Sequence, residues 1–330
     1  MTIPSFKILK FNATERLAAS QNQKRVVLVY TGIITLLAAL VTVVCYALKL
    51  QISQTGGLSN MGLRTILSTI QSVLPMVQNL VVMCLDLGYV AAMVRVSREQ
   101  YVSERTLTLG FDRFWVMLRY TLIQACIYMT ACMAAFWVAM QIWLLTPLSN
   151  AVMGMVTPEM ADPNVVMELL QDPVFASQIT TAMMPLLLLV GVLYIIFLTP
   201  ISYSMRMTKY VIIDKPGQGA LYALKESKKM MKGNCLRLFK LDISLLWWYA
   251  IGFCSTLLCY GDVLLPMVGI QLPWSETVSY FLFYALFLIL QFVSCYFLRN
   301  RIEVIYAQVY NALKPREKDA GVVLGNIFQM

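Results

Sequence analysis

Long apolar runs separated by short polar segments dominate the chain. The first has no charged residue from Val26 to Leu48, and runs of similar length recur toward residue 298. A helix needs about 20 apolar residues to cross the ~30 Å hydrocarbon core of a bilayer. The pattern therefore predicts an all-α integral membrane fold, a bundle of six transmembrane helices. These spans are expected at about 26–48, 69–94, 120–145, 181–205, 241–265 and 277–298.

The first run is expected to remain in the protein as a membrane helix. At 23 residues it is longer than the 7–15 residues of a signal-peptide core, and no convincing cleavage site follows it. The predicted organisation is a basic N-terminal segment over 1–25, a membrane domain over 26–298 and a polar tail over 299–330.

Composition agrees with lipid as the solvent and argues against an enzyme. The chain is 59% hydrophobic and 13% charged, whereas soluble domains carry about 25% charged residues. It has no His, no Gly-Lys dipeptide and no Cys-x-x-Cys pair among its 8 Cys. These absences argue against His-dependent catalysis and a phosphate-binding loop. We expect no catalytic residue, cofactor or metal.

Basic residues are distributed unequally between the two sides of the predicted bundle. With the N-terminus inside, 24 of the 26 Lys and Arg residues fall on the inner side, and only Lys49 and Arg64 fall on the other. The loop over 146–180 contains acidic residues but no Lys or Arg. Positive charge is enriched in cytoplasmic loops, so both termini are expected in the cytoplasm.

The strongest concentration of positive charge precedes the predicted fifth span. Over about 218–232 the spacing predicts an amphipathic surface helix, with small and apolar residues on one face and Lys residues on the other. The net charge of +9, placed beside apolar spans, favours anionic lipid headgroups over nucleic acid. The residues expected to contact lipid or a membrane partner are Lys225, Lys228, Lys229, Lys232, Arg237 and Lys240.

Short sequence matches suggest an internal repeat. Asn22 to Arg25 and Asn234 to Arg237 share the pattern Asn-x-x-Arg at the entrance to an apolar run, and Gly110 to Trp115 leads similarly into another. We interpret these as three repeats of a cytoplasmic surface helix followed by a transmembrane hairpin.

The segment from Ser202 to Tyr249 carries a recognisable set of residues. It includes Asp214-x-Pro, Ala223-x-x-x-Ser, Met231-x-Gly and Leu238-Phe-x-Leu. This set resembles the DUF975 family of bacterial multi-pass membrane proteins. The resemblance implies a location in the bacterial cytoplasmic membrane and no established reaction.

Asp86 is the most unusual charge within a predicted span. It lies nine residues before Arg95, or roughly 13 Å into the helix. Such a residue is either functional or part of the hydrogen bonding between helices. Arg119 is a natural partner for it. The predicted intramembrane polar seam consists of Gln71, Gln78, Asn79, Asp86 and Arg119.

Two functional hypotheses follow. The first is a non-enzymatic membrane protein that engages anionic lipid or a membrane partner through its basic cytoplasmic face. The alternative is a transporter of a small solute or lipid that uses the seam around Asp86. The sequence defines neither a substrate nor an oligomeric state.

Overall fold

A computed structural model describes residues 3–20, 22–54, 61–147, 149, 173–261, 264–265 and 273–314. Within these ranges the chain forms helices and turns and no strand. The all-α class predicted from the apolar runs is therefore confirmed.

The chain divides into two compact units, which we describe separately. Unit 1 comprises Met1–Leu118 and Arg206–Met330, and unit 2 comprises Arg119–Met205. Helix α5 (Phe114–Leu144) begins in unit 1 and continues into unit 2, where α8 (Pro173–Met205) also lies. The first half of unit 1 contains α1 (Phe6–Ala19), α2 (Gln23–Gln54), α3 (Met61–Ser97), η2 (Glu104–Thr108) and α4 (Leu109–Asp112). Its second half contains α9 (Thr208–Asp214), α10 (Ala220–Met231), α11 (Cys235–Ile243), α12 (Leu246–Cys259), α14 (Glu276–Ser294), η4 (Cys295–Arg299) and α15 (Asn300–Leu313).

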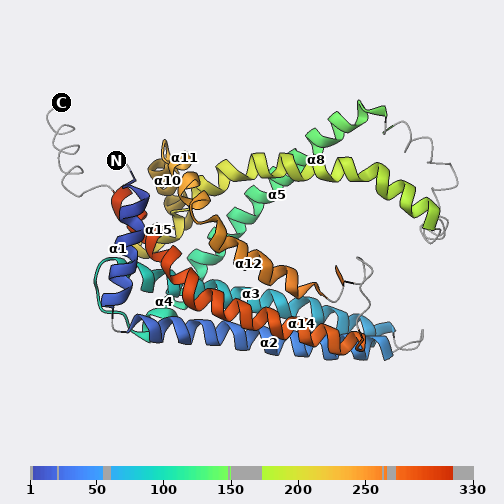
Figure 1. The fold of residues 1–330 in the computed structure, drawn as a ribbon, viewed down its shortest axis with the longest axis horizontal. Helices are drawn as coiled ribbons and strands as arrows, with labels where there is room; N and C mark the ends of the chain where they lie inside the picture. The colour runs from blue at the N-terminus through green and yellow to red at the C-terminus, as the bar shows by residue number, and fades with distance from the viewer. Residues whose placement is uncertain are drawn as a thin grey trace. The chain divides into compact units, whose positions relative to one another are not determined.

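The long helices α2, α3 and α14 form the body of unit 1. Helix α2 packs along α3 and also contacts α14, and α12 packs against α14 (Figure 1). The outer side of α2 exposes Leu36, Leu40 and Val43, which recur at helical spacing. A stripe of exposed large apolar side chains is unfavourable in water and suits the lipid interior.

Five helical stretches are long and apolar enough to cross a membrane, which supports a multi-pass membrane protein. They are Gln23–Ser53, Gly62–Ser97, Phe114–Leu144, Met183–Asp214 and Thr277–Leu313.

The span expected over 241–265 differs from the prediction at its start. Residues up to Ile243 belong to the separate helix α11, and α12 has only 14 residues. This corresponds to about 21 Å at 1.5 Å per residue, short of the ~30 Å hydrocarbon core. Some of the residues that follow α12 lie outside the described ranges, so the six-span count remains a prediction, as does the threefold repeat.

The segment expected as a polar tail begins as a packed helix. Helices α14 and α15 are joined without a break through η4, a short π-helical segment. Every residue of α15 from Val304 to Tyr310 is buried, and the helix packs against α1 and α3. The packing of this segment was not predicted because its mostly apolar stretch from Val304 to Tyr310 is short and follows Arg301 and Glu303, so no run long enough for a span marks it.

Two glycines allow the segment after α3 to fold back closely onto it. A Cβ on Gly88 would collide with the backbone of Leu107, and a Cβ on Gly110 with the backbone of Cys84. Backbone-to-backbone contact of this kind is available only where the side chain is absent. The contact fixes η2 and α4 against the same part of α3 that carries Asp86.

Unit 2 has a small core of its own. Ala139 and Trp143 of α5 pack against Leu186 of α8. The neighbouring Leu187 and Leu188 are exposed on the surface of α8, as expected for a helix that meets lipid. Much of the acidic loop predicted over 146–180 lies outside the part of the chain that the structure describes.

Candidate functional site: a basic surface and buried ion pairs

Helices α10 and α11 present one face to the protein and the other to the surroundings. The buried face of α10 contains Ala223, Ser227 and Met230, and that of α11 contains Leu238 and Leu241. The spacing of these residues, three or four apart, places them on one side of each helix. The two helices are therefore anchored on unit 1 by their apolar sides.

A left-handed glycine separates the two helices. Gly233 has φ +80°, a conformation that residues with a Cβ rarely adopt. The following Asn234 is buried, and its side-chain amide donates to the carbonyl of Met230 at 3.1 Å. This turn redirects the chain so that α11 continues the exposed surface begun by α10.

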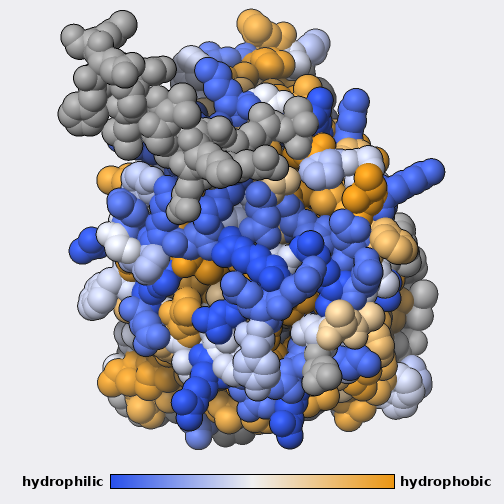
Figure 2. Space-filling view, turned by 90° about the vertical axis from the view of Figure 1, so that its left-hand side faces the viewer, coloured by the Kyte–Doolittle hydropathy of each residue, from blue (hydrophilic) through white to orange (hydrophobic). Residues whose placement is uncertain are grey.

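The outer side of the two helices is basic and interspersed with apolar residues. We call this side, together with exposed Leu221, Leu236 and Phe239, the basic surface. Figure 2 shows the end of the molecule at which α1, α15 and these helices lie as mostly hydrophilic, with apolar residues between the polar ones. All six residues expected from the sequence to make the lipid or partner contact are exposed: Lys225, Lys228, Lys229, Lys232, Arg237 and Lys240.

A small basic crevice lies between α1 and α15, beside the residue that precedes α12. It has a volume of about 80 Å³, and its lining includes Lys10, Leu245, Arg301 and Ile305. Lys10 donates through Nζ to the backbone carbonyl of Ser244 at 3.1 Å, which links α1 to this corner. Two cationic side chains beside apolar ones are suited to a phosphate group attached to an acyl chain.

Asp86 lies at the centre of a partly buried charge cluster. Lys209 of α9 and Arg299 of η4 each form an ion pair with one of its carboxylate oxygens. Tyr30 of α2 donates its hydroxyl to Asp86 at 3.2 Å. The carboxylate therefore joins four segments that are distant in the sequence.

Aromatic rings surround Arg299. Its guanidinium carbon lies 5.3 Å from the ring centroid of Tyr30 and 5.2 Å from that of Tyr89, within the range of a cation–π interaction. The two rings stack at 4.2 Å. The π-helical turn of η4 carries Arg299 into this position; such turns are frequent at functional sites.

A second buried carboxylate, Asp214, ties together the ends of several helices. Arg98 binds both of its oxygens at 2.8 Å, and Lys314 donates to it at 2.9 Å. Tyr310 adds a hydrogen bond of 3.0 Å. Hydrogen bonding to Asp214 raises the pKa of Arg98, so its guanidinium stays charged throughout the neutral range.

The structure gives Asp86 partners other than Arg119, the residue expected from the sequence. Its carboxylate is neutralised by Lys209 and Arg299, whereas Arg119 is an exposed residue of unit 2. Neither residue was predicted as a partner of Asp86. Lys209 was placed in the basic loop after the fourth span, and Arg299 was placed in the C-terminal tail. The Asp-x-Pro motif marked Asp214 but gave no indication of its partners.

The other seam residues lie on α3 outside this cluster. Gln78 is eight residues before Asp86, about 12 Å along the helix. Gln71 and Gln78 are half-buried, whereas Asn79 is exposed. The stripe is therefore a feature of α3, and only Asp86 belongs to the charge cluster. Among the described residues, no group of three or more Cys, Asp or Glu side chains is placed to hold a metal ion.

The long apolar helices and the basic surface define the class of the molecule, a multi-pass α-helical membrane protein. The family model for a protein of unknown function, DUF975, matches residues 5–317, and the chain belongs to this family. The comparison with curated proteins and the comparison with solved structures both give no match.

Proposed function

We propose that this chain is a non-enzymatic protein of the bacterial cytoplasmic membrane that engages anionic lipid headgroups through its basic surface. The observation that carries the proposal is the composition of the exposed side of α10 and α11. Six cations stand there beside Leu221, Leu236 and Phe239, which are 63%, 75% and 41% exposed.

This mixture fits an interfacial location better than water. Lys and Arg stems lie along apolar surface while their charged ends reach headgroups. Each basic residue near an anionic leaflet contributes about 1 kcal/mol. The apolar side chains between them would enter the acyl boundary, as in amphipathic helices that lie in the membrane plane.

The ion pairs of Asp86 weaken the alternative of transport. A carboxylate that binds a cation or solute must be able to release its protein partners. Asp86 is held by two cations and a tyrosine hydroxyl, and its side chain is only 14% exposed. This arrangement supports a structural role for Asp86. A transport path that needed a free Asp86 carboxylate would then lack its central residue.

The proposal can be tested on the full-length protein in lipid nanodiscs. The discs would contain equal amounts of phosphatidylglycerol and phosphatidylcholine, and native mass spectrometry would count the lipids retained on release. The variant is K228Q/K229Q. The matched control is K49Q/R64Q, which removes two exposed cations near the end of α2 and the start of α3.

We expect retained phosphatidylglycerol to exceed phosphatidylcholine in the wild type and to fall several-fold in K228Q/K229Q but not in the control. Equal retention in all three proteins would overturn the lipid assignment. A protein subunit retained by the wild type and lost in K228Q/K229Q would instead assign the surface to a membrane partner.

A further inference from the structure

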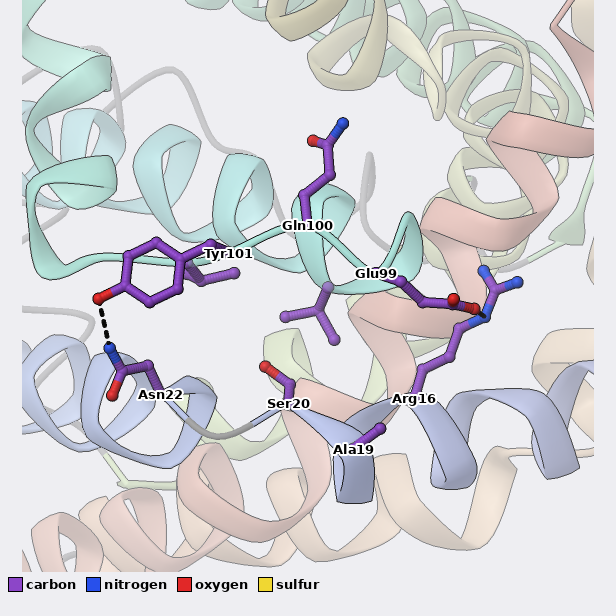
Figure 3. A pocket seen from close by; sticks show the side chains of 9 residues that line it. Arg16, Ala19, Ser20, Asn22, Glu99, Gln100 and Tyr101 are labelled. Carbon is purple, nitrogen blue, oxygen red and sulfur yellow. Dashed lines mark hydrogen bonds and ion pairs between the residues drawn. The ribbon is translucent and has the colours of Figure 1, made fainter.

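A pocket of about 460 Å³ lies at the corner where α1 ends and α2 begins. The end of α3 and the residues leading to Val102 form its other side. Figure 3 shows the side chains that line it. Its volume is within the range of small-molecule sites, about 300–1,000 Å³, and it is distinct from the basic surface.

Two side-chain pairs hold the pocket in shape. Arg16 donates to the backbone carbonyl of Ser97 and forms an ion pair with Glu99 at 3.5 Å. On the other side, Asn22 donates through Nδ2 to the hydroxyl of Tyr101 at 2.9 Å (Figure 3). The pairs join the α1–α2 corner to the end of α3, so the walls come from segments about 80 residues apart.

The end of α3 adopts an unfavourable conformation at the pocket wall. Glu99 has φ 59°, in the left-handed region where glycine is usual. It follows the last turn of α3 in a Schellman arrangement, in which Gln100 N–H donates to the Arg95 carbonyl at 2.9 Å and Glu99 N–H donates to that of Val96 at 3.0 Å. Non-glycine residues in such conformations are concentrated at functional sites. Here the conformation places the Glu99 carboxylate beside Arg16.

The lining combines an apolar floor with uncharged hydrogen-bonding groups. Val96 and Val102 are each 1% exposed. Ser20, Asn22 and Gln100 supply a hydroxyl and two amides, which both donate and accept hydrogen bonds. The charges of Arg16 and Glu99 neutralise each other, so the pocket has no net charge with which to select an anion.

Tyr101 provides an aromatic surface at the same site. Its side chain is 75% exposed although its hydroxyl is held by Asn22. An aromatic ring next to amides and a hydroxyl suits a ring-shaped molecule with C–H groups on its face and hydroxyls on its edge. A phosphate or carboxylate would meet the Glu99 carboxylate without a free cation to balance it.

We propose that this pocket binds a neutral polyhydroxy group, as in a hexose. The group could be supplied by the headgroup of a glycolipid or by a free sugar, since both present the same hydroxyls. The inference does not depend on the proposed role of the basic surface, because none of the six cations of that surface lines the pocket.

The test uses the full-length protein in phosphatidylcholine nanodiscs, because sugar-based detergents would occupy the site. The discs contain either monoglucosyldiacylglycerol or diacylglycerol at the same fraction, and native mass spectrometry counts the retained molecules. The variants are Y101A and Q100A. Y260A, which removes another exposed tyrosine, is the matched control.

We expect one glucosyl lipid per protein, with retention reduced about tenfold or more in Y101A and Q100A and unchanged in Y260A, a difference of about 1.4 kcal/mol. Competition by free methyl glucoside would identify the sugar itself as sufficient; absence of competition, with the lipid still retained, would identify the glycolipid as the ligand. Equal retention of diacylglycerol, or glucosyl lipid binding that is insensitive to Y101A and Q100A, would overturn the proposal.

Phosphatidylserine provides a further arm of the experiment. It is anionic and lacks a polyhydroxy headgroup, so its retention should depend on Lys228 and Lys229 and be unaffected by Y101A. Retention that is lost in Y101A would mean that the pocket selects anions and would overturn the neutral assignment. Failure of the pocket proposal would leave the test of the basic surface unaffected.

Discussion

At the scale of single residues, the charge of Asp86 is expected to be important for the stability of unit 1. Its carboxylate forms ion pairs with both Lys209 and Arg299, and Arg299 also lies close to two stacked tyrosine rings. Removal of one partner from a fully buried ion pair leaves an uncompensated charge and costs about 3–5 kcal/mol, which is an upper bound for this partly buried cluster. We therefore expect D86N to destabilise the protein strongly.

The measurement for D86N is thermal unfolding followed with a thiol-reactive dye, because Cys84 and Cys295 are buried. Unfolding of D86N should begin at a clearly lower temperature than in the wild type. D112N, at an exposed carboxylate of the same unit, should leave the transition unchanged. The double variant D86N/R299Q should recover part of the loss. If D86N unfolded at the same temperature as the wild type, the structural role of Asp86 would be contradicted and the transport hypothesis would regain support.

Asp86 could be identified from the sequence, but its partners could not. A charge within an apolar run is visible locally, and so are the two faces of α10, because both depend on residues within a few positions. Lys209 and Arg299 are 123 and 213 positions away from Asp86. Only the folded chain brings α9 and η4 to Asp86, and a single sequence contains no signal for that packing.

At the scale of elements, α15 continues the last long helix and packs against α1 and α3. Its Gln308 is 8% exposed, with its amide oriented to donate to the carbonyl of Leu9 at 3.1 Å and to accept from the N–H of Ala13 at 3.2 Å. The interface between α1 and α15 is therefore close enough for a side chain to bond to the backbone of the neighbouring helix. Ala13 is 1% exposed at this contact.

This interface predicts opposite effects at adjacent positions of α1. A13D would bury a carboxylate without a partner, which costs several kcal/mol, whereas T14D places the same group on the exposed side. We expect A13D to lower the amount of monodisperse protein recovered by gel filtration several-fold and T14D to behave as the wild type. Equal recovery of both variants would mean that α1 does not pack on α15 as described.

The same interface shows why the C-terminal segment was predicted as a polar tail. Apolar runs identify membrane spans because a helix within the bilayer contacts either lipid or other apolar helices on every side. A helix that packs on protein does not need a run of about 20 apolar residues, and the buried part of α15 lies between Glu303 and Asn311. Its polar residues are too frequent for a predicted span, and only its neighbours show that the helix is packed.

At the scale of the whole molecule, the number of crossings determines the side on which the C-terminus lies. The five long apolar helices alone would place the two termini on opposite sides of the membrane. The C-terminal segment from Arg299 onward would then carry its 5 basic residues outside, against the enrichment of Lys and Arg in cytoplasmic loops. A sixth crossing that begins with α12 restores 24 of the 26 basic residues to the inner side.

The charge distribution therefore predicts that α12 crosses the membrane together with residues that follow it, although α12 alone is too short. Green fluorescent protein, which fluoresces only inside, is expected to be fluorescent at either terminus. A phosphatase that is active only after export should be active when inserted between residues 150 and 172 and inactive at the C-terminus. An active C-terminal phosphatase would establish an odd number of crossings and contradict the six-span bundle. The basic surface follows the fourth span. If the insertion at 150–172 is active, this surface is cytoplasmic whether the chain has five spans or six. The lipid proposal therefore does not depend on the sixth span.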